Sequence, residues 1–296
     1  MSQSAAQALD DLSFDLVYSD GWPLDSNWER IQINLLIDVA RQAMAERGRP
    51  DYFVGGDMFV YHSVEQARDV ARGRPYLRGP DFFFVGGVEN HDRKAWVSWQ
   101  EGGRLPDVIA EFLSPSTKKI DRTVKKDLYA RIFRASEYFL YEPKTGKMEG
   151  LTLVDGRYQR LFPDAENRLW SEQLGLKLGL WHGLREDVET TWVRLFEADG
   201  RLMPTKDEAA EARAEAERQQ AQAERQQAEA ERQRAEVERQ RAEAERQRAE
   251  AADARAEAAD ARAEAADARA EAERQRAEAA EAELARLRAK LEGAAG

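Results

Sequence analysis

The sequence has no cysteine among its 296 residues, which excludes disulfide bonds and zinc sites built from thiolates. It also has no run of about 18 consecutive apolar residues, the length that a helix needs to cross a bilayer. The first ten residues contain neither the basic nor the apolar segment of a secretory signal. These absences predict a cytoplasmic protein that does not enter a membrane.

An excess of positive charge is also missing. Lys and Arg number 45 against 56 Asp and Glu, giving a formal net charge of −11. Neither the first 204 residues nor the remainder is basic. A protein of this composition that binds nucleic acid would have to offset phosphate repulsion with a local basic face or with a divalent metal ion.

The last third of the chain has no aromatic side chain, since every Phe, Tyr and Trp lies at or before position 196. A dense core is therefore expected only in the front part. We predict a disordered N-terminus over 1–13, a folded domain over 14–204, a long helix over 205–292 and a disordered end over 293–296.

The predicted long helix repeats every seven residues from Ala214 onward, with units such as AEAERQR and AEAADAR. A seven-residue period is typical of coiled coils. Its apolar stripe is mostly alanine, however, and a convincing seam is present only at Leu284, Leu287 and Leu291. Glu and Arg three or four residues apart would also stabilise a solitary helix. The sequence leaves both forms open, including assembly with a second copy or a partner helix.

The folded domain shows the periodicities of a mixed α/β protein. Apolar residues at helical spacing predict a helix over 27–46, and Ser26 with Glu29 forms a capping box at its start. A second helix is expected over 120–134. Aromatic and β-branched runs bounded by Gly or Pro predict strands; they cover 52–61, 81–88, 107–113, 138–141, 147–154 and 157–162, the last two joined at Asp155-Gly156. The order favours a central sheet covered by helices.

Two carboxylates stand at strands that are otherwise apolar. Asp81 precedes the run Phe82–Val85, and Glu111 lies inside the run Val108–Leu113. A buried carboxylate needs a partner. Two acids that meet at a sheet edge can hold Mg²⁺ and leave positions for water and phosphate. The alternatives are an ion pair with Arg for Glu111 and an ordinary turn for Asp81.

Five short blocks follow one another in a recognisable order: Gly79-Pro80-Asp81, PDVIAEFLSPST over 106–117, Lys125 with Tyr129, Glu137-Tyr138, and Glu142-Pro143. In order and spacing they resemble the Uma family of restriction endonucleases, part of the PD-(D/E)XK nuclease superfamily. The resemblance covers residues 14–200, and some members end in similar Glu/Arg/Ala repeats. It implies a restriction-endonuclease-like mixed sheet flanked by helices.

The resemblance also implies a site, in which Asp81 and Glu111 bind Mg²⁺, or Mn²⁺ in its place. The standard motif has Lys two residues after the acid, where this chain has Leu113. The family pattern moves that Lys to the following helix, which matches Lys125. Lys125 would orient or deprotonate the attacking water, or stabilise charge on phosphate. Further departures are Ala135-Ser136 in place of a Gly-Val turn and Glu142-Pro143 in place of Asp-Pro, and both affect turns rather than ligands.

Several neighbouring residues are secondary candidates. Lys126 rivals Lys125 from a position about 100° around the helix. Glu29 is a candidate for a further metal-shell oxygen, although capping explains it better, and Asp57 is either an additional acid or a turn residue. The basic stretch after Glu111 suggests contacts to the DNA backbone or a solvated helix face; its candidates are Lys118, Lys119 and Arg122. Trp96 and Trp99 are expected to flank a strand.

Taken together, the sequence predicts a metal-dependent endonuclease that hydrolyses DNA phosphodiester bonds. One alternative is an inactive scaffold that assembles through residues 205–292, with Glu111 paired to Arg or Lys and no room for metal. Another is a DNA-binding module that does not cleave.

Overall fold

The computed structural model describes residues 14–18, 24, 26–74 and 79–293. The chain divides into two units, residues 1–213 and residues 214–296. The ends predicted to be disordered lie outside the described residues, apart from Gly293, which ends the long helix. The first unit is the mixed α/β domain that the sequence predicts.

Helix α2, Asn27–Glu46, has the predicted bounds. It starts where expected because the Ser26 side chain accepts a hydrogen bond from the Glu29 backbone N–H at 3.2 Å, which satisfies one of the free donors of the first turn. Ile31, Leu35 and Val39 recur at helical spacing and are buried. The helix is therefore amphipathic, and burial of this stripe holds it in the core.

The central sheet has six strands in the order β1-β3-β5-β6-β7-β8. The strands are β1 Tyr52–Gly55, β3 Phe82–Gly86, β5 Val108–Phe112, β6 Glu137–Glu142, β7 Lys147–Val154 and β8 Arg157–Arg160. Only β5 and β6 pair in parallel; the other neighbours are antiparallel. The predicted hairpin at Asp155-Gly156 joins β7 to β8, with Val154 opposite Arg157.

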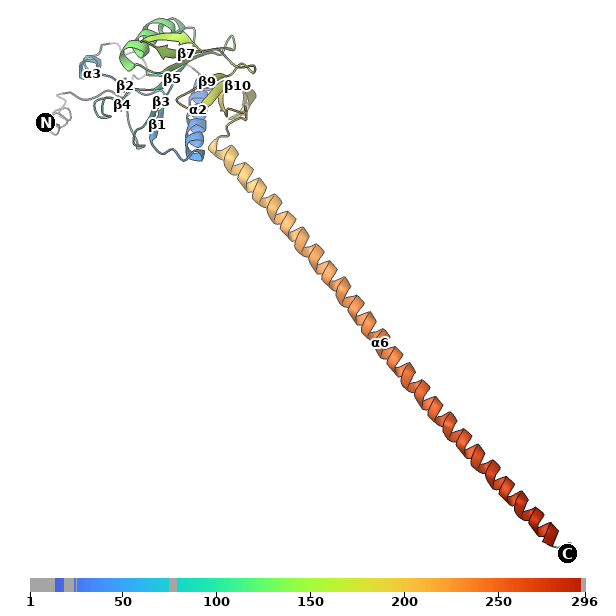
Figure 1. The fold of residues 1–296 in the computed structure, drawn as a ribbon. Coiled ribbons are helices and arrows are strands. Elements are labelled where there is room, and N and C mark those ends of the chain that lie inside the picture. Colours follow the sequence, from blue (N-terminus) through green and yellow to red (C-terminus); the bar gives the residue numbers. More distant parts are fainter. Residues whose placement is uncertain (1–13, 19–23, 25, 75–78, 294–296) are drawn as a thin grey trace. The chain divides into compact units, whose positions relative to one another are not determined.

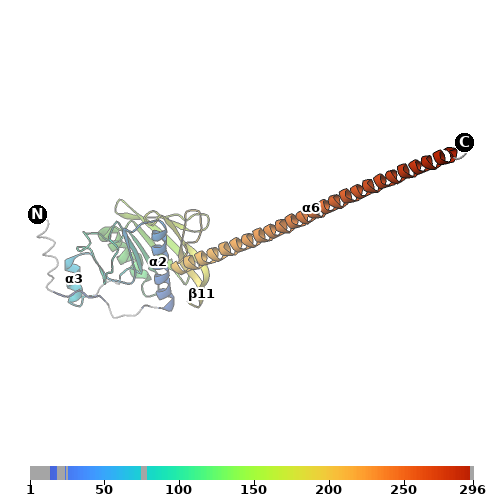
Figure 2. The same ribbon diagram turned by 90° about the horizontal axis from the view of Figure 1, so that it is seen from below.

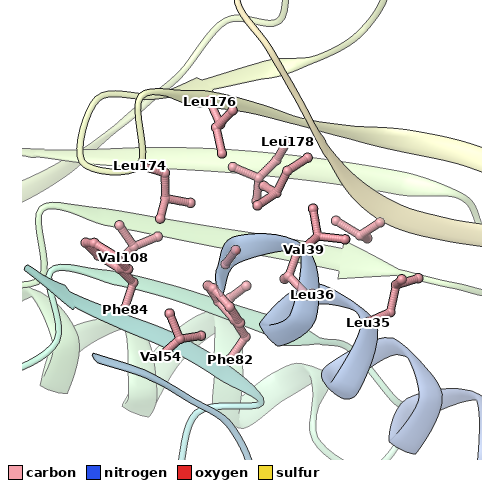
Figure 3. Packing of buried hydrophobic residues seen from close by; sticks show 14 of the residues in the cluster. Leu35, Leu36, Val39, Val54, Phe82, Phe84, Val108, Leu174, Leu176 and Leu178 are labelled. Atoms are coloured by element: carbon pink, nitrogen blue, oxygen red, sulfur yellow. The ribbon is translucent and has the colours of Figure 1, made fainter. Parts of the chain in front are cut away.

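One face of this sheet packs against α2 and a smaller sheet. The smaller sheet has the order β11-β10-β9, with β9 Leu169–Ser171, β10 Leu176–Arg185 and β11 Val188–Phe196. Figure 3 shows side chains of both sheets and of α2 in one apolar cluster, with Leu36 among them. Figure 2 shows β11 near α2, where the Gln32 side chain hydrogen-bonds both backbone groups of Val193. Helix α2 and the smaller sheet thus share one face of the central sheet, and β9 also contacts β6 directly through Ser171 and Glu137.

The opposite face of the central sheet is covered by the helix that connects β5 to β6. It comprises α4 Lys118–Ile120, the π-helical turn η1 Asp121–Lys125, α5 Lys126–Leu128 and the π-helical turn η2 Tyr129–Phe133. Arg134, with a φ of 54°, ends it. The sequence predicts this helix over 120–134 but does not reveal its π turns. Such turns are rare and are frequently found at functional sites.

The predicted strand over 52–61 is wrong in one respect, because it is interrupted. Asp57 adopts a φ of 48°, a left-handed conformation that no strand can accommodate. The chain therefore leaves the central sheet after β1, and β2, Val60–Tyr61, pairs in parallel with β4, Trp96–Val97. Trp96 lies within that short strand instead of flanking it. Helix α3, Val64–Ala71, follows β2 and was not predicted.

The long helix α6 runs from Lys206 to Gly293 (Figure 1). Thr205 and Glu208 form a reciprocal capping box at its start: each side chain accepts a hydrogen bond from the other residue's backbone N–H. Within the second unit, the side chains that the structure describes from residue 215 onward are exposed, and Leu284 is 55% exposed. Among the helices of the described residues, none is long and apolar enough to cross a membrane.

Candidate active site

Asp81 and Glu111 are brought together by the register of β3 and β5. The two strands are antiparallel, with Phe82 opposite Ala110 and Phe83 opposite Ile109. Continuing this register by one residue sets Asp81 opposite Glu111. Side chains directly opposite each other on antiparallel strands are neighbours on one face. The sequence predicts both acids, and the alternation along β5 turns Glu111 toward the helix that connects β5 to β6.

The Glu111 carboxylate is 1% exposed and both of its oxygens accept hydrogen bonds. Lys125 Nζ donates to Oε2 at 2.9 Å, and the Tyr129 hydroxyl donates to Oε1 at 2.7 Å. The two donors are four residues apart on the connecting helix. Because a buried charge is stable only when it is paired and hydrogen-bonded, this cage explains how an acid can stand inside an apolar strand.

Lys125 has a second acidic neighbour that the sequence reasoning missed. Asp121 Oδ1 lies 3.1 Å from Lys125 Nζ, and Asp121 is 1% exposed. An acid four residues before a Lys in a predicted helix would have been the signal for it. Lys126, the rival candidate, is partly exposed on another side of the helix. The structure therefore brings Lys125, and not Lys126, against Glu111.

Asp81 lies at the partly exposed edge of this cluster. Its Oδ2 accepts the backbone N–H of Phe112 at 2.6 Å, which fixes the side chain across the end of β5. Burial raises the pKa of Asp81 well above its usual range, and the charge of Glu111 raises it further, against the lowering effect of Lys125. The charge of Glu29 acts in the same direction. Glu29, buried at the start of α2, is thus within electrostatic reach of Asp81.

The ionisation of Glu111 and Lys125 is set by the same burial. Burial raises the pKa of Glu111 to about 7, although Lys125 opposes the shift. For Lys125, burial alone would lower the pKa, but the carboxylates of Glu111, Asp121 and Asp81 outweigh it and raise the pKa above the ordinary value. Lys125 is therefore a permanent cation, and Glu111 is poised to gain or lose a proton near neutral pH.

The donor set suits a hard divalent cation that retains several waters. Among the described residues, no three His, Cys, Asp or Glu side chains form a cluster that could hold a metal alone. Two carboxylates do meet, and Oδ1 of Asp81 has no hydrogen-bond partner within the described part of the chain. Mg²⁺ is commonly held by one or two carboxylates, with water and phosphate oxygens completing its shell. Asp81 and Glu111 fit that pattern.

A pocket of about 390 Å³ opens at the end of β5 and the loop that follows it. It is lined from α2 by Trp28 and Glu29, from β5 and the following loop by Phe112 and Ser114, and by Lys144. Phe112 links the pocket to the site, since its backbone N–H binds Asp81. Asp81, Glu111 and Lys125 do not line this pocket, so Phe112 is the residue that it shares with the contacts of the site.

Two of the three basic residues proposed to contact DNA are already paired. Lys118 Nζ lies 2.5 Å from Glu142, and Arg122 makes two hydrogen bonds of 3.0 Å with Glu149. The hydrogen bonds from Arg122 lower the pKa of Glu149 to about 2. Lys119 is exposed and has no ion pair among the residues that the structure describes. Asp57, the other acid considered, is an exposed turn residue with positive φ.

The chain is similar to one known protein family and to a solved structure. The profile of the family described as "Uma2: Putative restriction endonuclease" matches residues 11–189. A solved structure from Anabaena variabilis, described as "a putative nuclease belonging to DUF820", is similar at 11% identity; the match covers 57% of this chain and 89% of that chain, with a TM-score of 0.36. No curated protein matches the chain.

Proposed function

The chain belongs to the Uma2 family of restriction endonucleases, and on that premise we propose that it is a metal-dependent endonuclease that hydrolyses phosphodiester bonds of DNA. The observation that carries the proposal is the cluster of Asp81, Glu111 and Lys125. Glu111 is buried, 2.9 Å from Lys125 Nζ, and one register step brings Asp81 opposite it. Asp81 and Glu111 would hold Mg²⁺ or Mn²⁺.

The charge balance of the cluster supports the metal dependence. When ionised, Asp81, Glu111 and Asp121 carry three negative charges, and Lys125 supplies one positive charge. Such a site would repel the phosphate of DNA. A divalent cation at Asp81 and Glu111 would reverse that repulsion, lower the pKa of a bound water and stabilise charge on the phosphate oxygens. A phosphodiester substrate without metal would bind poorly.

Lys125 is suited to stabilise charge and not to remove a proton. Three carboxylates raise its pKa, so it stays protonated and cannot accept a proton from water near neutral pH. Its ammonium would instead orient the attacking water or stabilise the negative charge that develops on phosphate as the P–O bond breaks. The sequence left open whether Lys125 orients the attacking water, deprotonates it or stabilises charge on phosphate. The raised pKa of Lys125 argues against deprotonation.

The pocket at the end of β5 is our candidate for the place where the substrate enters. Glu29 and Lys144 border it, and Phe112 connects it to the site. Lys119, exposed on the connecting helix, is the best remaining candidate for a contact to the DNA backbone. Glu29 would act on the site through its charge, which raises the pKa of Asp81, since within the described part of the chain it forms no three-ligand cluster with Asp81 and Glu111.

One observation favours the inactive scaffold as a second candidate. Both oxygens of Glu111 are engaged, by Lys125 and Tyr129, so the pair is stable without metal. The scaffold further requires that no space for metal remains. Oδ1 of Asp81, which accepts no hydrogen bond from the residues that the structure describes, opposes that requirement and favours the nuclease.

Cleavage of supercoiled plasmid by the purified full chain tests the proposal. Wild type would be incubated with Mg²⁺, Mn²⁺ or EDTA, beside Asp81→Asn and Glu111→Gln. Asp127→Asn and Glu166→Gln are matched controls, because both residues are exposed and no ion pair of the described residues joins either of them to the cluster. We expect metal-dependent nicking in wild type and controls and none in the two site variants. Salt-sensitive binding without product would identify a DNA-binding module, and neither binding nor product would identify the scaffold.

A further inference from the structure

Asp121 is the least explained charge in the cluster. Its carboxylate is 1% exposed, and Lys125 is the one cation within 4 Å of it among the residues that the structure describes. Oδ1 lies 3.1 Å from Lys125 Nζ yet makes no hydrogen bond to any described group. A buried carboxylate with an incomplete set of hydrogen bonds is costly. The fold retains it although Lys125 already has a partner in Glu111.

The backbone holds Asp121 firmly at this place. Asp121 and Lys125 are the first and last residues of the π-helical turn η1. The Tyr138 hydroxyl of β6 donates to the Asp121 carbonyl oxygen at 3.0 Å, which ties the turn to the strand next to β5. Asp121 and Glu111 are thus both anchored to the central sheet, on either side of one flexible lysine side chain.

The two carboxylates give Lys125 two alternative partners. Its ammonium has three N–H donors and a flexible four-carbon stem. At present its hydrogen bond goes to Oε2 of Glu111, and the Tyr129 hydroxyl occupies Oε1. A metal ion on Glu111 would need an oxygen lone pair and would be repelled by an ammonium at 2.9 Å. Lys125 could release Glu111 only if its own charge remained paired.

We propose that Asp121 is a positioning residue that takes over the Lys125 ammonium when Glu111 binds a divalent cation. The proposal rests on the proposed function, because it assumes that Glu111 is a metal ligand. The Lys125 ammonium would move from one carboxylate to the other and would remain buried and charged. In the metal-free protein, Asp121 Oδ1 already lies 3.1 Å from Lys125 Nζ without forming a hydrogen bond, so the second partner is in place before metal binds.

Replacing Asp121 by Asn removes the second partner and leaves the pair of Lys125 and Glu111 intact. Lys125 then competes with the cation for Glu111. We expect the dissociation constant for Mn²⁺, measured by titration calorimetry without DNA, to rise about 10- to 100-fold, the range typical when an outer-shell partner is lost. Asp121→Glu restores a carboxylate and should recover at least part of the affinity. Asp127→Asn, in the same helix but exposed, should bind Mn²⁺ like wild type.

A double-mutant cycle separates this transfer of the Lys125 ammonium, here called the handover, from a general attraction of the cation by the Asp121 charge. In a Lys125→Met background no ammonium competes for Glu111, so Asp121→Asn should change the Mn²⁺ affinity less than about twofold. General attraction by the Asp121 charge predicts instead that the loss persists. Circular dichroism and thermal unfolding would verify that each variant is folded, and Asp121→Ser would replace any Asn variant that is not.

The outcomes distinguish this proposal from the function on which it rests. If wild type binds Mn²⁺ at Asp81 and Glu111 but Asp121→Asn binds equally well, the handover is wrong and the nuclease proposal stands. The same holds if the Asp121→Asn effect survives in the Lys125→Met background. If wild type binds no Mn²⁺ and the Glu111→Gln variant behaves like wild type, both proposals fail.

Discussion

The two units of the chain differ in whether their charged side chains are buried or exposed. In the first unit, Glu111, Asp121 and Lys125 are almost completely buried and contact one another. In α6, the charged side chains that the structure describes beyond residue 214 are exposed, and Arg246 pairs with Glu250 at the surface. Exposed pairs add little to stability, whereas a buried charge is costly unless it is compensated. The buried charges are therefore costly to keep, as expected if the cluster serves the proposed function, whereas the exposed charges of α6 carry little such cost.

The largest expected effect comes from removing the one cation of the cluster. Lys125→Met leaves the buried Glu111 and Asp121 without compensation, so the free energy of unfolding at pH 8 should fall by about 3–5 kcal/mol. Urea unfolding followed by tryptophan fluorescence measures it, because every Trp lies at or before position 192. Arg246→Met in α6 is the control, with a change below about 0.5 kcal/mol. Equal changes in both variants would remove the contrast between the units.

The next effect is a pH dependence carried by Glu111. Burial raises its pKa to about 7 in the folded protein, against an ordinary value of 4.5. Between these values the folded state binds more protons than the unfolded state, so stability falls as pH rises through this range and levels off above about 7. The loss should be roughly 3 kcal/mol at most. Asp81, whose pKa is also raised, adds to it with the same sign.

Thermal unfolding of the metal-free protein between pH 5 and pH 8 would reveal this slope. Glu111→Gln cannot titrate, so its profile should be flatter than that of wild type. Profiles with the same slope would show that Glu111 does not keep its proton in the folded state.

A smaller effect is expected where α6 begins. Thr205→Ala removes the hydroxyl that accepts the Glu208 N–H, and the free energy of unfolding should fall by about 1 kcal/mol. Thr123→Ala, whose exposed hydroxyl donates to a helix carbonyl, is the matched control and should change it by less than about 0.5 kcal/mol. Faster hydrogen exchange confined to the first turn of α6 would locate the loss. Equal losses in the two variants would show that the capping box is unimportant.

The smallest effect on the first unit should come from breaking α6 itself. Ala252→Pro disrupts an exposed helix interior at a local cost of about 3 kcal/mol. The far-ultraviolet circular dichroism signal should decrease, while the fluorescence-detected unfolding of the first unit should stay unchanged. A shift in that unfolding transition would mean that the two units stabilise each other.

Local patterns predict the elements that they specify directly. Helix α2 follows from the spacing of Ile31, Leu35 and Val39 and from the Ser26 cap. Strands β3 and β5 follow from continuous apolar runs, and their acids stand out for the same reason. The meeting of Asp81 with Glu111 could be expected, but their register depends on long-range pairing that no local pattern encodes.

What the sequence could not predict depends on tertiary context. The π-helical turn η1 sets Asp121 beside Lys125. The spacing of apolar residues in the sequence does not distinguish such a turn from an α-helix. The break after β1 arises because Asp57 adopts a positive φ, which the sequence Gly55-Gly56-Asp57 permits but does not require. The pairing of Arg122 with Glu149 likewise joins residues from different elements. The sequence therefore does not show that Arg122 is already engaged in an ion pair.

The most direct test of the central claim is to measure cleavage and stability together in Glu111→Gln at neutral pH. Lys125 keeps Asp121 as a partner in this variant, so the protein should remain folded with unchanged or higher stability. Metal-dependent plasmid nicking should fall by at least about 100-fold, as expected when a metal ligand and not merely an outer-shell partner is lost. Nicking at the wild-type rate by the folded variant would contradict the account, because Glu111 would then be a structural residue alone.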